Sequence, residues 1–244
     1  MRLDYDRVAD GYDAQPYRGK ELDADLAAFA RGRTDVRVLD VGCGTGNQLV
    51  ADRAVAGARL VGVDRFLGML RKARAKDAGI GWIQADAARL PLAAGAFDFA
   101  TMQYAFHHVE RKAELLGALH RVLRPGGRFV MSNICPQRMR GWLVYRYFPE
   151  ALARDLEDFM PPEEIRAELE RAGFRGVTAA LDERRLDEDV AAFAAYARTR
   201  ANISQLMTIT DAEYAAGLAR LETDARAGGK RPSELCLLRI TAER

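Results

Sequence analysis

Short apolar runs alternate with amphipathic stretches through the first two thirds of this chain. The apolar runs are of strand length and predict strands at residues 36–41, 60–64, 80–85, 96–102 and 128–133. The intervening stretches carry helical spacing and predict helices at residues 47–55, 68–78 and 110–123. Strands that alternate with helices usually form a parallel sheet, so the pattern predicts an α/β fold with a doubly wound sheet.

The pattern changes after residue 133. Residues 136–160 are rich in aromatic side chains and are expected to be irregular, and a helix is expected to follow, up to residue 172. Further on we expect a strand at 174–181, two or three helices within 187–227 and a last strand at 234–241. The predicted organisation is an N-terminal helical cover (1–34), a core (35–184) with a lid segment (136–160), a helical insertion (185–230) and a final strand segment (231–244).

Composition narrows the class of protein. The 244 residues carry a formal net charge of +2, so no overall charge attracts the chain to phosphate backbones, and we expect no nucleic-acid partner. The three cysteines are far apart in sequence, which suits neither a metal site nor a disulfide framework and fits the reducing cytoplasm. No apolar run reaches the length of a membrane span, so we expect no membrane partner, and the chain is expected to be a monomer or homodimer.

A glycine-rich turn follows the first predicted strand. It reads Asp-Val-Gly-Cys-Gly-Thr-Gly over residues 40–46, and glycines in such a turn let a ligand approach the backbone. The spacing is GxGxG, whereas dinucleotide-binding turns need GxGxxG, and position 47 is Asn. Asp40 stands two residues before the first glycine, where it would repel a pyrophosphate but attract an ammonium or a sulfonium. The alternative is a tight turn that binds no ligand.

Two more acids stand at the ends of the next strands. Asp64 closes the second strand and has the position of an acid that accepts hydrogen bonds from ribose hydroxyls. Asp86 follows the third strand, where it would accept from an adenine amino group. Each has a plainer interpretation as a helix cap or turn residue. Met69, on the helix after Asp64, is either a neighbour of adenine or an ordinary core residue.

Taken together, these motifs resemble those of class I methyltransferases that depend on S-adenosylmethionine (SAM). The first motif is residues 38–46, the second is 61–64 with Met69 and Leu70, and the third and fourth cover 84–92 and 97–98. Residues 123–127 resemble the turn into the fifth strand, and Tyr5 to Asp13 resembles the N-terminal helix that closes over SAM. The likeness is greatest to the small-molecule branch that includes ubiquinone and menaquinone methyltransferases.

The resemblance implies a Rossmann-like sheet whose antiparallel last strand lies between strands five and six. It also implies SAM as methyl donor, with S-adenosylhomocysteine as product, and a small-molecule acceptor methylated on C, N or O by in-line displacement. The cofactor-binding residues it implies are Asp40, Gly42, Gly44, Asp64, Met69, Asp86, Ala87, Gln103 and Tyr12. Two departures from the family pattern are Arg65, where a small or acidic residue is usual, and the insertion at 185–230.

Residues for the acceptor are fewer. His107 and His108 follow the fourth strand, and they are candidates for a general base or for structural residues. Tyr17 and Arg18 belong to the N-terminal cover and are candidates for cofactor or acceptor contacts. Trp142, Tyr145 and Arg146 suit a flat or anionic acceptor, or equally an amphipathic lid packed on the sheet.

Three other functions remain open at this stage. An RNA or protein methyltransferase is less favoured, because residues 102–106 read Met-Gln-Tyr-Ala-Phe and lack the Pro-Pro-aromatic run used to stack a flipped base. A non-catalytic SAM-binding protein would keep the cofactor acids without an acceptor site. An oxidoreductase that uses a dinucleotide is disfavoured by the missing third glycine.

Overall fold

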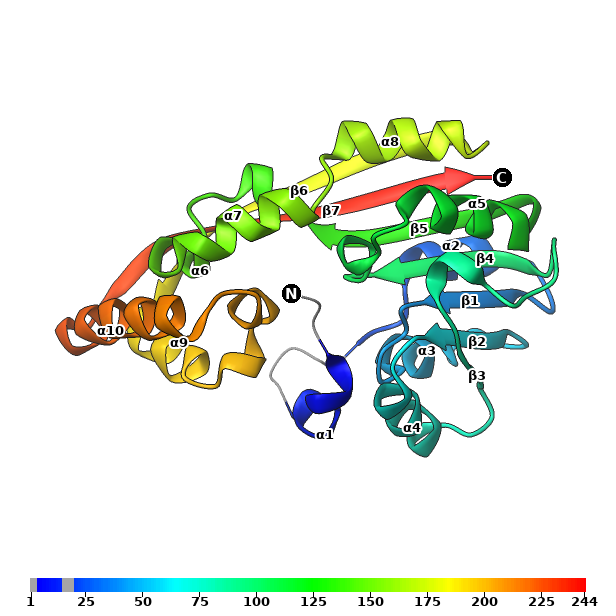
Figure 1. The fold of residues 1–244 in the computed structure, drawn as a ribbon. Coiled ribbons are helices and arrows are strands. Elements are labelled where there is room, and N and C mark those ends of the chain that lie inside the picture. The colour runs from blue at the N-terminus through cyan, green and yellow to red at the C-terminus, as the bar shows by residue number, and fades with distance from the viewer. Residues whose placement is uncertain (1–3, 15–19) are drawn as a thin grey trace. The chain divides into compact units, whose positions relative to one another are not determined.

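The computed structural model of the protein describes residues 4–14 and 20–244. The described chain forms two compact units. The core unit contains residues 4–133, 163–180 and 239–244, and the helical unit contains residues 134–162 and 181–238. The candidate site lies in the core unit, which is drawn on the right of Figure 1.

A seven-stranded sheet runs in the order β3-β2-β1-β4-β5-β7-β6 (Figure 1). Strands β1 (Arg37–Val41), β2 (Arg59–Asp64), β3 (Gly81–Gln84), β4 (Phe97–Gln103) and β5 (Leu123–Ile134) pair in parallel. Strand β7 (Lys230–Glu243) is antiparallel to β5, because the amide of residue 126 donates to the carbonyl of 244 and that of 135 to 236. This topology confirms the predicted fold, including the antiparallel last strand between strands five and six.

The chain order reverses between β1 and β4, and open α/β sheets generally bind ligands at such a point, in a crevice beyond the carboxyl ends of the strands. The core-unit helices are η1 (Tyr5–Arg7), α1 (Ala9–Tyr12), α2 (Ala24–Ala30), α3 (Asn47–Asp52), α4 (Leu67–Lys76), η2 (Ala87–Arg89), η3 (Phe106–His108), α5 (Lys112–Val122) and most of α8 (Pro162–Arg171). Side chains of α2 pack onto the strands: Phe29 lies 5.6 Å from Phe99 of β4 between ring centroids. This buried packing holds α2 beside the candidate site.

The helical unit contains η4 (Pro136–Arg138), α6 (Leu143–Tyr147), α7 (Pro149–Asp158), α9 (Val190–Ala197), η5 (Arg200–Asn202), η6 (Ser204–Met207) and α10 (Asp211–Ala227). The expectation that residues 136–160 are irregular was therefore wrong. Pro149 occupies the first turn of α7, where its fixed φ suits a helix, and good helix formers follow it. The expectation of two or three helices within 187–227 is confirmed by α9 and α10.

Strand β6 (Arg175–Asp189) is longer than the predicted 174–181 and continues into the predicted insertion. Its second half, Asp-Glu-Arg-Arg-Leu-Asp-Glu-Asp, is highly charged and mostly exposed, so hydrophobic alternation could not reveal it. Charged side chains are a common feature of edge strands, because they discourage pairing with other chains. Among the described residues, no helix is both long and apolar enough to cross a membrane.

Candidate functional site

The glycine-rich turn connects β1 to α3 at the crevice. Gly44 has a φ of +52°, and no heavy atom lies within 4 Å of where a Cβ would stand, so its side is open. Gly42 has a φ of +74°, and a Cβ there would meet the Cβ of Ala105 at 2.5 Å. Left-handed φ values and close packing therefore both favour glycine in this turn. One glycine closes the turn against the segment after β4, and the other leaves room beside the backbone.

Asp40, on β1, is buried in front of this turn at 2% exposure. Burial and then the negative charges of Asp52 and Asp64 raise the pKa of Asp40, while the charge of Lys20 opposes them. The Oδ1 atom of Asp40 is buried without a hydrogen-bond partner among the described residues. A buried polar atom in this condition is costly, and it indicates a place where a ligand donor fits.

Asp64 ends β2 beside the same turn. Its two oxygens accept hydrogen bonds from the amides of Gly44 and Phe66, each at 2.9 Å. Burial raises the pKa of Asp64, although both backbone donors oppose the shift. Asp64 thus joins the glycine-rich turn to the start of α4. These contacts agree with its plainer interpretation as a turn residue. The neighbouring Arg65, the unusual residue at that position, has its guanidinium 5.5 Å from the ring of Phe66.

Asp86 follows β3 and is the cap of η2, since its Oδ1 accepts from the amide of Ala88 at 2.9 Å. Its Oδ2 pairs with Arg111 at 2.7 Å. The hydrogen bond from Ala88 and then the Arg111 pair lower the pKa of Asp86, so it stays a carboxylate. Ala87 begins η2, and Met69 is buried on α4 at 2% exposure. Asp86 thus acts as a cap and Met69 as a core residue, and their cofactor roles stay predictions.

Gln103 ends β4 within a polar network. Its Nε2 donates to Oδ2 of Asp23 at 3.3 Å, and its Oε1 accepts from Nζ of Lys20 at 3.2 Å. Asp23, the buried cap of α2, is held by Arg239 of β7 at 2.8 Å to both carboxylate oxygens. The same guanidinium binds Asp25. Residues from β4, β7 and the segment before α2 are thereby fixed together at the carboxyl end of β4.

The two histidines lie in η3, immediately after this network in the chain. Their rings are 3.8 Å apart between centroids. His107 shares a hydrogen bond with Asn133 at 3.3 Å through Nδ1, and His108 shares one with the hydroxyl of Tyr5 at 2.9 Å through Nε2. Desolvation is the main reason that the pKa values of both rings are lowered. The charges of His108 and Lys112 lower the pKa of His107 further. The charge of Lys112 adds to the effect at His108, whose pKa is lowered to about 4. Both imidazoles are therefore neutral at pH 7.

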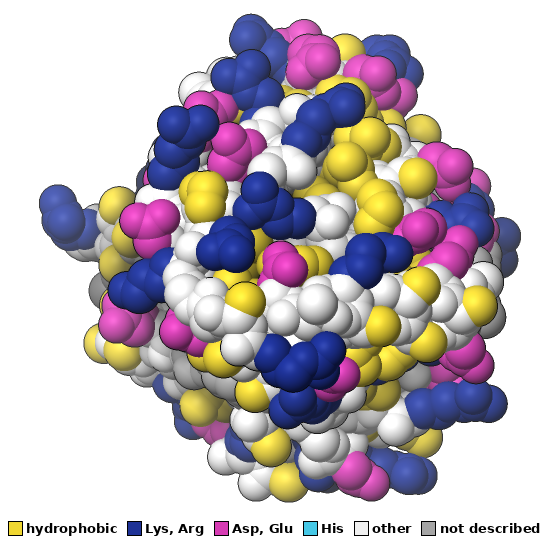
Figure 2. All heavy atoms as spheres, turned by 90° about the vertical axis from the view of Figure 1, so that its left-hand side faces the viewer, with side chains coloured by type: hydrophobic (Ala, Val, Ile, Leu, Met, Phe, Trp, Pro, Cys, Tyr) yellow, Lys and Arg dark blue, Asp and Glu magenta, His cyan; other side chains and the backbone are white. Residues whose placement is uncertain are grey.

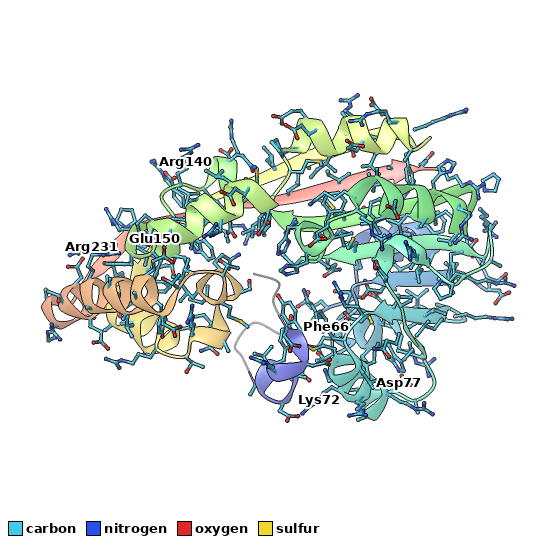
Figure 3. The ribbon with its side chains drawn as sticks, in the orientation of Figure 1. Phe66, Lys72, Asp77, Arg140, Glu150 and Arg231 are labelled. Carbon is cyan, nitrogen blue, oxygen red and sulfur yellow. The ribbon has the colours of Figure 1, made fainter. Side chains whose placement is uncertain are left out.

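The N-terminal segment 4–14 lies against three of these loops. Tyr5 reaches His108 after β4, Asp6 accepts from the amide of Gly68 at 2.6 Å after β2, and Asp13 accepts from Thr45 at 2.6 Å after β1. Figure 3 shows Phe66 and Lys72 on the side of α4 that faces α1. Tyr12 stands edge-on to Tyr5 at 6.2 Å. Segment 4–14 therefore contacts these loops through its side chains. That this part of the chain covers a cofactor stays a prediction, and the candidates Tyr17 and Arg18 lie outside the described residues.

The acceptor candidates Trp142, Tyr145 and Arg146 belong to the helical unit. Tyr145 is buried, and its hydroxyl donates to Asp155 at 2.6 Å. Trp142 packs edge-on against Tyr145 at 5.1 Å, and Arg146 is exposed. Tyr145 therefore has a packing role within its own unit, and acceptor binding by these residues stays a prediction.

Comparison with known proteins settles the family. A family model for a methyltransferase domain matches residues 39–131, which include the glycine-rich turn, Asp64, Asp86 and both histidines. Demethylmenaquinone methyltransferase of Thermus thermophilus is 34% identical over 166 residues, covering 57% of this chain and 74% of that protein. The chain belongs to the class I SAM-dependent methyltransferases. This SAM-dependent enzyme is also 32% identical to a malonyl-acyl-carrier-protein O-methyltransferase of Pseudescherichia vulneris, over 57% of this chain and 56% of that one.

Solved structures share the fold. Phosphoethanolamine N-methyltransferase 2 of Haemonchus contortus, in complex with SAM, matches with a TM-score of 0.61 at 18% identity, over 98% of this chain and 57% of that one. The cyclase SpnF matches with a TM-score of 0.58 at 21% identity, over 98% of this chain and 80% of that one. At such identities the likeness concerns the fold alone, since one fold supports different reactions.

The chemistry of the site fits SAM. Its amino-acid part carries an ammonium and a carboxylate, and its sulfonium is a second cation. Buried Asp40 offers an oxygen that has no donor among the described residues, and the side of Gly44 is open. Asp64 lies next to that space with two carboxylate oxygens. An acidic, glycine-lined crevice of this kind suits a cationic nucleoside better than a pyrophosphate.

Several residues of the site carry no signal in the sequence. Lys20 and Asp23 both contact Gln103. Arg239 contacts Asp23 in turn, although the two are 216 positions apart. Asp13 was noticed only as part of the N-terminal resemblance, yet it binds Thr45, Asn47 and Lys76. Charged residues are usually solvated surface in a single sequence, so only the three-dimensional contacts distinguish these four.

Proposed function

We propose that this enzyme transfers the methyl group of SAM to a small-molecule acceptor at the crevice between β1 and β4. The observation that carries the proposal is the buried carboxylate of Asp40 beside the open side of Gly44. Relatives named for demethylmenaquinone and for the malonyl group of an acyl-carrier protein support an acceptor group of small size. Whether carbon, nitrogen or oxygen is methylated follows from the acceptor.

The cofactor role of each residue follows from its place around the turn. Asp40 and Gly42 with Gly44 would line the methionine and ribose end, with the Asp40 carboxylate facing the ammonium. Asp64 would hold the ribose hydroxyls, exchanging part of its contact with the Gly44 amide for them. Asp86, Ala87 and Met69 would adjoin the adenine, and the cover with Tyr12 would exclude water. Gln103 would face the methionine part at the end of β4.

SAM, when bound, supplies a methyl group on a sulfonium, which is a good leaving group. The protein must then align the acceptor atom with the methyl and, for a protonated acceptor, remove a proton. Neutral His108 is suited to that removal, and Tyr5 orients its ring through the shared hydrogen bond. His107, bound to Asn133, holds its neighbour in place by ring contact. This assignment supports an acidic acceptor, because an imidazole of low pKa is a weak base.

Two further functions remain as alternatives. An RNA or protein methyltransferase is less supported, because Lys and Arg side chains alternate with Asp and Glu on the face drawn in Figure 2. A non-catalytic SAM-binding protein would bind the cofactor and methylate nothing. We further propose a cytoplasmic location, supported by Cys43, Cys135 and Cys236, which form no disulfide in the described chain, and a monomeric or homodimeric state.

The deciding experiment is calorimetric titration with SAM, S-adenosylhomocysteine and NAD. The expected result is micromolar affinity for the first two and none for NAD. Asp64→Ala should abolish binding, and Asp35→Asn, at an exposed ion pair with Arg59, should leave it unchanged. Transfer of tritium-labelled methyl to demethylmenaquinone, a malonyl thioester or a wider metabolite set would then identify the acceptor. Absence of SAM binding by the wild type would overturn the proposal, and binding without transfer to any acceptor would favour the non-catalytic alternative.

A further inference from the structure

Cys135 and Cys236 face each other on two neighbouring antiparallel strands. The amide of Cys135, the residue that follows β5, donates to the carbonyl of Cys236 in β7 at 2.9 Å. Near the other end of the two strands, the amide of Arg244 donates to the carbonyl of Gly127 at 2.9 Å. Equal numbers of residues separate these two contacts on the two strands, so one register holds between them. Side chains that face each other in such a register lie on the same side of the sheet, and the two thiols therefore lie together.

The two thiols are in contact inside the helical unit. Both side chains are buried, and they share a hydrogen bond. Burial, followed by the interactions with Cys135 and Glu183, raises the pKa of Cys236 to about 11. The charge of Arg138 opposes this shift, and Arg138 forms an exposed ion pair with Glu183 at 2.9 Å. Cys236 is therefore a protonated thiol at neutral pH, and its charged neighbours reach solvent.

The spacing of the pair suits a disulfide bond. Facing residues joined by a backbone hydrogen bond have Cα atoms about 5.5 Å apart, and a disulfide spans Cα distances of about 4.4–6.8 Å. The Cβ atoms of such residues are about 5.5 Å apart, whereas a disulfide needs about 4 Å, so the bond would pull the two strands together. Strain of this kind makes a disulfide easier to reduce. The pair is therefore better suited to a bond that forms and breaks than to a permanent one.

Two other uses of the pair fit the structure less well. A metal site would need further ligands, and the described residues contain no group of three or more His, Cys, Asp and Glu side chains that could hold a metal ion. Ordinary core packing explains why each thiol is buried, but it gives no reason for two of the three cysteines of the chain to face each other. The third, Cys43, is buried in the glycine-rich turn of the core unit and provides an internal comparison.

We propose that Cys135 and Cys236 form a reversible disulfide bond, which makes the pair an oxidative modification site for a small disulfide such as oxidised glutathione. When the strands open locally, one cysteine loses its proton and its sulfur attacks the small disulfide, which releases one thiol. The second cysteine then displaces the other half as a second thiol. The small disulfide is thereby reduced to two thiols, and their two hydrogen atoms come from the cysteine pair.

The position of the bond indicates what it would restrain. Strands β5 and β7 each belong partly to the core unit and partly to the helical unit, and the division falls after residue 133 in β5 and before residue 239 in β7. Cys135 and Cys236 lie close to these points in sequence, on the helical side. A covalent link there would hold the two strands to each other within the helical unit. Disulfides of cytoplasmic proteins are usually transient and redox-sensing, which agrees with a reversible link.

The test uses the intact protein without cofactor. Native protein is incubated with oxidised glutathione at mildly alkaline pH, the remaining thiols are alkylated in urea, and tryptic peptides are analysed by mass spectrometry. Two of the three thiols should be lost, and one linked peptide pair should contain Cys135 and Cys236, whereas Cys43 should be alkylated. Dithiothreitol should restore both thiols. The Cys43→Ala variant should form the same link, and the Cys236→Ala variant should form none.

A second sample, unfolded in urea before the oxidant is added, shows that the reagent is active. If all three thiols remained in the native sample while the unfolded sample reacted, the proposal would be overturned. A glutathione adduct on either cysteine without the link, or a link that includes Cys43, would also overturn it. The wild-type protein carries the decisive result, so poor folding of an alanine variant would not affect it. The result is also independent of SAM binding and therefore of the proposed function.

Discussion

Asp13 accepts a hydrogen bond from the hydroxyl of Thr45 at 2.6 Å, and this bond ties the end of α1 to the glycine-rich turn. The same carboxylate accepts from Asn47 at 3.1 Å and pairs with Lys76 at 2.7 Å. Although partial burial alone would raise the pKa of Asp13, the contacts with Lys76, Thr45 and Asn47 lower it. Segment 4–14, the described start of the predicted cover, is thereby attached to the turn through an ionised group.

This attachment predicts a kinetic effect of Asp13→Asn. An amide in place of the carboxylate loses the Lys76 pair and keeps one acceptor, so the cover should open more often and release the cofactor product faster. Stopped-flow displacement of S-adenosylhomocysteine should show a rate constant for dissociation raised by about 3- to 30-fold, which corresponds to roughly 0.7–2 kcal/mol. The matched control is Asp35→Asn, which alters an exposed pair with Arg59 at 2.7 Å. A dissociation rate equal to that of the wild type would mean that the cover does not retain the cofactor.

Arg239 should matter for stability, because it is the cation that pairs with Asp23 and Asp25. Its removal leaves Asp23, 7% exposed, without its cation, and Asp25 without one of its contacts. Because the Arg239 side chain is itself 30% exposed, the full cost of breaking a buried pair is reduced by solvent, and Arg239→Gln should lower the free energy of unfolding by about 2 kcal/mol. Urea unfolding measures it. Arg184→Gln, at an exposed pair with Asp182, is the comparison and should change the value by under about 1 kcal/mol.

His108 gives a prediction for catalysis once an acceptor is known. With its pKa lowered to about 4, the imidazole stays neutral from pH 8 down to about 5, so proton removal by this group should not weaken over that range. His108→Gln should reduce kcat by about 100-fold or more, the contribution of a general base. The tritium-transfer assay at several pH values checks both statements. Loss of activity with an apparent pKa near 6.5 in the wild type would show that the pKa of His108 is not lowered and would contradict this prediction.

The alternation of strands and helices, the glycine-rich turn and the acids at the strand ends were predictable because each depends on residues close together in sequence. The place of the last strand between strands five and six came instead from the family resemblance. Asp64 and Asp86 were also expected as turn or cap residues, and both make such contacts. Contacts between distant segments were not predictable: the Gln103–Lys20 pair joins residues 83 positions apart, and nothing in either local sequence favours the other. The same is true of Arg239, whose strand looks like ordinary antiparallel sheet.

Local patterns also failed where polarity concealed regular structure. The charged end of β6 shows no hydrophobic alternation because both of its faces are largely exposed, and its backbone pairing alone makes it a strand. In residues 136–160 the many aromatic residues mask the helical periodicity of α7. The start of this helix does carry a sequence signal, because Pro149 stands in its first turn with the acid Glu150 beside it.

The helical unit provides a test of pH dependence through Asp155. Its carboxyl accepts from Tyr145 at 2.6 Å, and burial raises its pKa to about 7 despite hydrogen bonds from Tyr145 and Gln205. Between about pH 4 and pH 7 the folded state therefore keeps a proton on Asp155 that the unfolded state, with an ordinary pKa of 3.8, has already released. The contribution of this protonated carboxyl to the free energy of unfolding is complete below about pH 4 and is lost as the pH rises through about 7.

The prediction is a difference between two proteins rather than one curve, because His107 and His108 have lowered pKa values and oppose the trend. From pH 5 to pH 7 the free energy of unfolding of the wild type should fall relative to Asp155→Asn, by at most about 1.4 kcal/mol per pH unit for one proton. Asn keeps an acceptor for Tyr145 but has no proton to lose. Urea unfolding across this range, followed by a probe of the helical unit, makes the comparison. If the free energy of unfolding changed with pH in the same way for both proteins, Asp155 would already be ionised in the folded state. The hydrogen bond from Tyr145 and contact with solvent would then offset the effect of burial on its pKa.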